Sequence, residues 1–143
     1  MHAIHCVTDE AFRSFGRVIA FPKTFEGNFH IVADDEKEPW RLAVFRYENR
    51  SIRRIECHPD SMESFEPLSG TSILLAAPHE APEAFQLFLL DRPIILEKGV
   101  WHQVAALSET AMVKITENRS VYSVYYDLPR TVLIGGLEEE ESV

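Results

Sequence analysis

Short apolar runs separated by polar turns fill most of this sequence, and helical periodicity is rare. Apolar runs of about four to eight residues that end at Pro, Gly, Asn or Asp are typical of β-strands. The expected strands are 17–21, 41–47, 51–58, 71–77, 84–90, 94–96, 103–107, 111–116 and 121–126. Because these strands are short and regularly spaced, the pattern predicts an all-β sandwich or barrel.

One short helix is expected near the start of the chain. Thr8 precedes Asp9, and Gly16 follows a few residues later. A hydroxyl cap, an acid in the first turn and a closing glycine are helix start and stop signals. Phe12 and Phe15 are three residues apart, so they would face the body of the domain together.

One predicted strand carries titratable groups at alternate positions. Side chains alternate across a strand, so Arg54, Glu56 and His58 would share one face. Ile55 and Cys57 would lie on the other. A strand that only covers a core puts apolar residues on its buried face, so this titratable face must be either solvated or functional. The strand alone leaves both alternatives open.

The stretch 54–70 resembles the first motif of the cupin family. That motif has a His-x-His pair, followed at set spacings by a glutamate and a glycine. Here His58 matches the second histidine, and Glu63 and Gly70 match the glutamate and the glycine. Glu56 stands where the first histidine usually is.

The stretch 97–102 resembles the second cupin motif and keeps its glycine and histidine as Gly99 and His102. Within the cupins, the sequence resembles the ureidoglycolate lyase family, formerly called ureidoglycolate hydrolase. That family carries Glu-x-His-Pro, Phe-x-Pro-x-x-Gly, Val-Trp-His and Phe-His-Ile segments. The matching segments here are Glu56-Cys57-His58-Pro59, Phe65-Glu66-Pro67-Leu68-Ser69-Gly70, Val100-Trp101-His102 and Phe29-His30-Ile31.

The resemblance implies a fold and a reaction. The fold is a cupin-like double-stranded β-helix, a jelly-roll sandwich or barrel, with a short N-terminal helix. The reaction is that of a carbon–nitrogen lyase in purine (allantoin) catabolism, which eliminates urea from ureidoglycolate to give glyoxylate. Two alternatives stay open: a metal-dependent cupin isomerase, and a non-catalytic cupin that binds a small molecule.

A metal site needs several nitrogen or oxygen ligands that converge on one point. The resemblance implies that His58 and His102 approach each other across adjacent strands. Glu56 and Glu63 would complete the set. Two imidazoles and two carboxylates suit Ni, Mn, Fe or Zn better than Ca. A metal-free barrel with a polar, water-filled mouth is the alternative, and the sequence leaves both open.

The lyase reaction needs a base for the substrate hydroxyl and a cation for the substrate carboxylate. Glu56 or His102 could be the base. Arg54 or Lys114 could be the cation, although Lys114 lies in an apolar strand where it faces either the interior or solvent. The expected substrate contacts are His30, Arg54 and Trp101.

Composition and charge narrow the choice of partners. The 143 residues carry a formal net charge of −9, which argues against nucleic acid or an anionic membrane and leaves a small carboxylate metabolite. No apolar run is long enough to span a membrane. With no signal pattern at the start, we expect a cytoplasmic protein with Cys6 and Cys57 as reduced thiols.

Organisation and assembly follow from the ends of the chain. We expect one domain at 1–137 and an acidic disordered tail at 138–143, because four consecutive glutamates occupy 138–141. Apolar strands near both ends of the chain leave exposed sheet edges, so a homodimer is expected.

Overall fold

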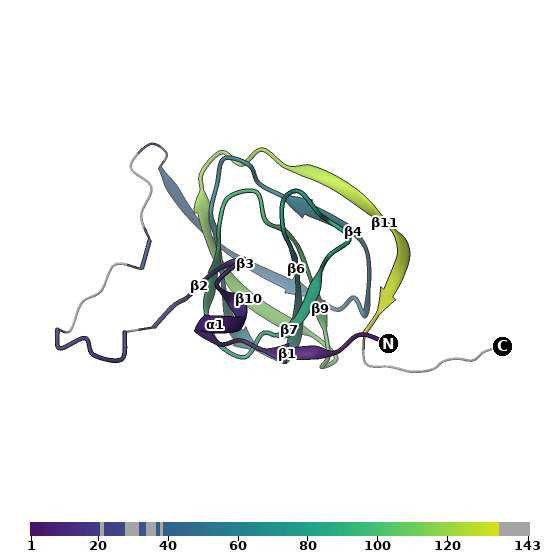
Figure 1. Ribbon diagram of the computed structural model, residues 1–143, viewed down its shortest axis with the longest axis horizontal. Helices are drawn as coiled ribbons and strands as arrows, with labels where there is room; N and C mark the ends of the chain where they lie inside the picture. Colours follow the sequence, from purple (N-terminus) through teal and green to yellow (C-terminus); the bar gives the residue numbers. More distant parts are fainter. Residues whose placement is uncertain (21, 28–31, 34–36, 38, 135–143) are drawn as a thin grey trace.

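Two stacked β-sheets make up this computed structural model, which describes residues 1–20, 22–27, 32–33, 37 and 39–134 (Figure 1). The strands are β1 (Ile4–Cys6), β2 (Gly16–Val18), β3 (Trp40–Tyr47), β4 (Ser51–Cys57), β5 (Glu63–Ser69), β6 (Ser72–Ala77), β7 (Gln86–Leu89), β8 (Ile94–Leu96), β9 (Trp101–Ala106), β10 (Ala111–Asn118) and β11 (Val124–Leu133). The six-stranded sheet has the order β1-β7-β6-β9-β4-β11, and the five-stranded sheet has the order β2-β8-β5-β10-β3.

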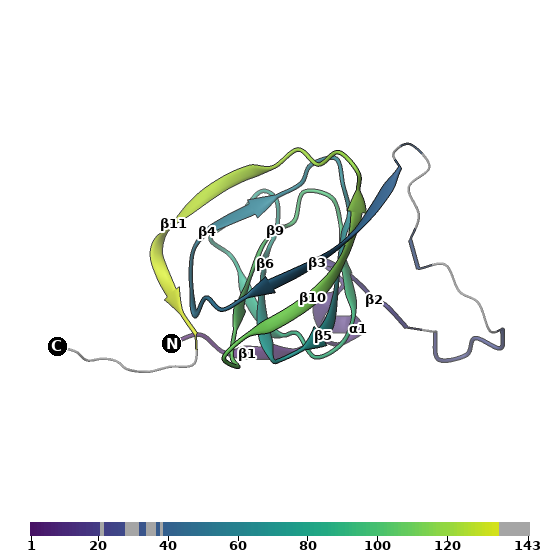
Figure 2. The same ribbon diagram turned by 180° about the vertical axis from the view of Figure 1, so that it is seen from behind.

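The chain winds back and forth between the two sheets. Successive strands from β3 to β6, and again from β7 to β11, belong to opposite sheets. Neighbouring strands such as β3 and β10, which cross the front of Figure 2 side by side, pair antiparallel, whereas β1 and β7 pair parallel. This winding is that of a jelly roll. The predicted fold class, a mostly β sandwich with one short helix, is therefore confirmed.

The predicted helix is present as α1 (Asp9–Phe12). The Thr8 hydroxyl caps it by accepting a hydrogen bond from a backbone N–H of the first turn. Phe12 and Phe15 are both buried, and each ring packs edge-to-face against Phe88 of β7. The helix thus anchors the N-terminal segment to the sandwich.

The apolar side chains form two cores, one on each face of the six-stranded sheet. The inner core, between the sheets, includes Phe65, Leu74, Phe88, Val104 and Val113. The outer core, to which β11 contributes Leu128 and Val132, also includes Ile55, Cys57, Leu75 and Trp101. Adjacent residues of β6 contribute to different cores because strand side chains alternate between faces. The strand predicted at 71–77 is therefore confirmed as β6, and all of its residues are buried.

The two motif glycines have a conformational role. Gly70 and Gly99 both have positive φ angles, of 76° and 80°. Such angles are disfavoured for residues with a side chain. A Cβ on Gly70 would also lie 2.2 Å from the carbonyl oxygen of Thr110. The turns into β6 and β9 therefore require glycine at these positions.

The strands differ from the prediction in several places. No strand was predicted for the segment of β5, which contains Pro67, yet it forms a strand whose register with β10 shifts close to this proline. β9 begins at Trp101, two residues earlier than expected, and β11 extends to Leu133. The short β1 was not predicted. Proline is tolerated in β5 because the ladder is irregular there.

Some predictions fall on residues that are not described. The acidic tail at 138–143 and the segment 29–31 lie outside the described residues. The domain boundary at 137 therefore stays a prediction. Within the described ranges, no helix is long and apolar enough to cross a membrane.

Candidate metal centre

Three strands bring the four predicted ligands together between the sheets. Glu56 of β4 stands directly opposite His102 of β9. His58 follows the last residue of β4, and Glu63 opens β5 in the facing sheet. The residues on either side of Glu56 point the other way, into the outer core. The alternation predicted for this strand is therefore confirmed, and the four side chains converge.

The two imidazoles are held by different partners. His102 Nδ1 donates to the carbonyl oxygen of Val100 at 2.9 Å. His58 Nδ1 lies 3.1 Å from the hydroxyl oxygen of Ser123. The ring centroids are 5.1 Å apart, and both side chains are buried. Because both Nδ1 atoms are engaged, the two Nε2 atoms are the ones available to a ligand.

Glu63 lies between the two rings. Its Oε1 atom is 3.1 Å from His58 Nε2 and 2.9 Å from His102 Nε2. Despite these distances, Glu63 Oε1 and His102 Nε2 find no hydrogen-bond partner of acceptable geometry in the described part of the chain. An unsatisfied buried polar group costs about 1–3 kcal/mol, so such groups are rare. Glu63 Oε1 and His102 Nε2 are thus buried and close together, but no well-directed hydrogen bond joins them. Such an arrangement is consistent with metal ligands that point at a shared ion.

The charges of this cluster are strongly coupled. Burial alone would raise the pKa of Glu63, but the charge and close contact of His102, and those of His58, outweigh it and lower that pKa to about 2. Burial would lower the pKa of His102, whereas Glu63 outweighs this effect and raises it. Each group therefore favours the charged form of the other, and a bound metal would take the place of a proton on His102 Nε2.

The donor atoms fit a first-row divalent metal. Metal–ligand bonds of about 2.0–2.2 Å place neighbouring ligand atoms about 3.0–3.5 Å apart. The two contacts of Glu63 match this spacing, whereas Glu56 Oε2 is farther away, 3.9 Å from His102 Nε2. Ligand atoms of Glu56, His58 and His102 all lie within 4.8 Å of one another. The His/Glu cluster could therefore bind a metal, with Glu56 at its edge.

A further carboxylate borders the same centre, and the sequence analysis missed it. Glu117 of β10 stands opposite Glu63, and with His58 these residues form a second group whose ligand atoms lie within 4.8 Å. On its other side, Glu117 Oε2 accepts hydrogen bonds from Arg41 Nε at 2.9 Å and Nη2 at 2.6 Å. Burial and the charge of Glu63 raise the pKa of Glu117, and Arg41 opposes them.

Alternation along β10 decides which of its side chains face the centre. Val113 and Ile115 lie in the inner core, so Glu117 also points inward and Lys114 points outward. Lys114 Nζ lies 3.4 Å from Glu66 Oε2. Lys114 therefore cannot reach the centre, and its predicted role as a catalytic cation is corrected. The same alternation, followed to the end of the strand, would have identified Glu117.

Trp101 also faces away from the centre. It alternates with His102 and packs in the outer core. Its indole N–H donates to the carbonyl of His79 at 2.8 Å, and the two rings stack. The substrate contact predicted for Trp101 is therefore corrected, because the indole fills the opposite face of β9.

The two remaining predicted contacts are not decided. Arg54 lies on the same face of β4 as Glu56, but its guanidinium pairs with Asp127 at 2.9 Å, and both side chains are exposed. A contact between Arg54 and a substrate stays a prediction. His30 lies outside the described residues.

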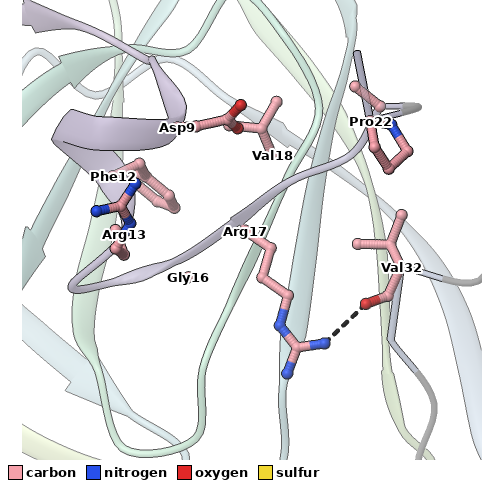
Figure 3. A pocket seen from close by; sticks show the side chains of 9 residues that line it. Asp9, Phe12, Arg13, Gly16, Arg17, Val18, Pro22 and Val32 are labelled. Carbon is pink, nitrogen blue, oxygen red and sulfur yellow. Dashed lines mark hydrogen bonds between the residues drawn. The ribbon is translucent and has the colours of Figure 1, made fainter. Parts of the chain in front are cut away.

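The described pockets lie elsewhere. One is beside α1, where Arg17 donates to the carbonyl of Val32 at 2.7 Å (Figure 3). Another lies between His2 and β11 residues such as Pro129. None of the four predicted ligands lines either pocket. These hollows therefore say nothing about the chemistry of the centre.

Comparisons with known proteins find remote likenesses among solved structures. No family model and no curated protein matches the chain. Among solved structures, it is similar to oxalate decarboxylase from Bacillus subtilis, with 14% identity over 64% of this chain and a TM-score of 0.48. It spans only 24% of that protein. It is also similar to the TDP-quinovose 3,4-ketoisomerase WlaRB from Campylobacter jejuni, with 13% identity, 65% and 68% of the two chains covered, and a TM-score of 0.46.

Proposed function

We propose that this protein is a cupin-type enzyme that uses a divalent metal ion to act on a small carboxylate-bearing metabolite. The proposed reaction is the elimination of urea from ureidoglycolate to give glyoxylate. The observation that carries the proposal is the buried Glu63, held between His58 and His102 without aligned hydrogen bonds. The choice of substrate is supported by the sequence segments that resemble the ureidoglycolate lyase family.

The roles of the four residues follow from their burial. His58, His102 and Glu63 are buried and would hold the ion. When bound, the ion would supply positive charge that polarises the hydroxyl and carboxylate oxygens of the substrate. Glu56 is 28% exposed, so it is the carboxylate of this set that a substrate can reach. We therefore assign Glu56 as the base in preference to His102, whose Nε2 is buried against Glu63.

The proposed step conserves all atoms of the substrate. Glu56 takes the proton of the hydroxyl group, and the carbon–oxygen bond becomes the carbonyl of glyoxylate. The carbon–nitrogen bond breaks with its electron pair moving to nitrogen, and Glu56 returns the proton to that nitrogen. The products are urea and glyoxylate, and no water is consumed.

The proposal is tested by assaying urea and glyoxylate together. Purified protein is loaded separately with Ni, Mn, Fe or Zn and supplied with ureidoglycolate. We expect equal release of both products with at least one metal. In Glu56→Gln we expect release to fall by about 10²–10⁴-fold while the bound metal is retained. If the wild type releases no urea with any of the four metals, the lyase assignment is wrong. A metabolite that binds without turnover would favour the non-catalytic alternative.

We also propose that the protein forms a homodimer through β3, the edge strand of the five-stranded sheet. β3 is an edge strand of this sheet, and Leu42 and Val44 are exposed on it. An exposed apolar edge strand is a template for pairing with another chain. A dimer mass in solution is expected, with Leu42→Lys/Val44→Lys shifting it to the monomer. A monomeric wild type would refute this assembly.

A further inference from the structure

A row of charged side chains leads from the edge of the five-stranded sheet into the metal centre. Arg41, Glu117 and Glu63 are register partners on the adjacent strands β3, β10 and β5. Glu63 contacts both imidazoles. Arg41 is the outermost member, with 48% of its side chain exposed, whereas the Glu117 side chain is only 8% exposed. The row therefore connects solvent to the proposed ion ligands.

Glu117 occupies only one edge of the Arg41 guanidinium. Both hydrogen bonds come from Nε and Nη2, and both end on the Oε2 atom of Glu117. Within the described residues, no hydrogen bond from Nη1 is recorded. A guanidinium carries five donors in a planar fork, so one held along a single edge can present the other to a second carboxylate.

The carboxylates around the centre would repel a negatively charged substrate unless a cation also binds it. Glu56, Glu63 and Glu117 place three carboxylates around the two imidazoles. A substrate carboxylate would add negative charge to this cluster, and the ion alone would have to offset it. Lys114 faces outward, whereas Arg41 is tied to the cluster through Glu117.

Building on the proposed function, we propose that Arg41 binds the carboxylate of the substrate at the rim of the metal centre. Glu117 is its positioning residue, because it fixes the orientation of the guanidinium without contacting the substrate. The ligand class is a small 2-hydroxy carboxylate whose hydroxyl faces the ion and whose carboxylate faces the edge of β3. The alternative cation is Arg54, which pairs with Asp127 within the six-stranded sheet.

The test measures binding of glycolate and of its neutral amide, glycolamide, to Mn²⁺-loaded protein by calorimetry. Both probes carry the hydroxyl group, but only glycolate carries the carboxylate. Arg41→Ala should weaken glycolate binding by roughly 10- to 100-fold, because a hydrogen bond to a charged group contributes about 1.5–3 kcal/mol. The affinity for glycolamide should stay unchanged. Arg17→Ala serves as the matched control, since Arg17 is a similarly exposed arginine paired with Glu97.

A double variant keeps the test free of folding artefacts. Arg41→Ala alone leaves the Glu117 carboxylate without its counter-ion, so Arg41→Ala/Glu117→Gln is compared with Glu117→Gln. The proposal is overturned if the double variant binds glycolate as well as Glu117→Gln does, if both probes weaken equally, or if only Arg54→Ala weakens glycolate. It is also overturned if the wild type does not bind glycolate. Binding of glycolate that depends on Arg41, without urea release, would refute the lyase reaction alone.

Discussion

Two charged groups of β4, only two residues apart, lie in opposite surroundings. Arg54 and Asp127 are exposed, and two hydrogen bonds join their side chains. Glu56 faces the buried His102 and Glu63, whose closest atoms are 2.9 Å apart without a well-directed hydrogen bond. The side chains of the exposed pair satisfy each other's hydrogen-bonding groups, whereas Glu63 and His102 in the buried cluster do not. A short distance between opposite charges therefore has a different meaning at the two places.

The energetics of the two regions explain the contrast. An exposed ion pair contributes little, because water solvates either charge nearly as well. A buried one must first offset the cost of removing both charges from water, and poor alignment reduces the hydrogen bonding that would help to do so. The attraction between Glu63 and His102 can stabilise the fold, but it leaves their misalignment unexplained, and an ion bound between them would explain it.

The largest effect is expected when the buried cluster loses one imidazole. His102→Ala removes the Nε2 atom that lies 2.9 Å from Glu63. We expect loss of metal binding and of turnover, because too few buried donors remain to hold the ion. Metal content after dialysis and urea release are measured together. The control is His5→Ala, since His5 is an exposed histidine of β1. Full metal content in His102→Ala would show that the ion binds elsewhere.

The second prediction concerns the stability of the metal-free protein as pH changes. The folded pKa of Glu63 is lowered to about 2, so its contribution is present above its ordinary pKa of 4.5 and is lost as pH falls toward 2. The folded pKa of His102 is raised, so its contribution is present below 6.5 and is lost as pH rises through the raised value. The pair therefore stabilises the fold most between pH 4.5 and 6.5.

Glu63→Gln removes the charge behind both pKa shifts and should flatten this profile. We expect the loss of roughly 2–4 kcal/mol of pH-dependent unfolding free energy. Urea denaturation at a series of pH values, in the presence of chelator, measures it for both proteins. Parallel profiles of the variant and the wild type would mean that Glu63 and His102 are not coupled.

A smaller effect on metal affinity is expected when His58 loses its hydrogen-bond partner Ser123. Ser123→Ala removes the hydroxyl that contacts His58 Nδ1. Loss of such an orienting contact typically weakens metal binding by about 10- to 100-fold. Competition with a chelator of known affinity measures the change. Ser120, an exposed serine of the same connection, supplies the control Ser120→Ala. Equal affinities in the two variants would rule out an orienting role for Ser123.

The smallest effect is expected from the exposed pair. Arg54→Ala should leave the urea midpoint of unfolding unchanged, because both partners remain solvated when separated. Asp127→Ala should behave in the same way. A clear drop in midpoint for either variant would remove the contrast between the two regions of β4.

The sequence predicted the face of β4, and the family resemblance implied the convergence of the four ligands. These depend on alternation within one strand and on motif spacing. Glu117 was missed because the predicted strand stopped at residue 116, and Arg41 was missed because its contact with Glu117 depends on which strands become neighbours. β3 and β10 are far apart in the chain, and no strand was predicted at β5, which lies beside β10. Trp101 was misjudged because its face differs from that of His102, which only the position of β9 reveals.

The most direct test of the central claim is the stoichiometry of metal binding. Apo protein is titrated with Ni, Mn, Fe or Zn, and bound metal is measured after removal of the excess. We predict one ion per chain for at least one of these metals, and none in the His58→Ala/His102→Ala variant. A wild type that retains none of the four, or a double variant that binds as much as the wild type, would contradict a metal centre at Glu63.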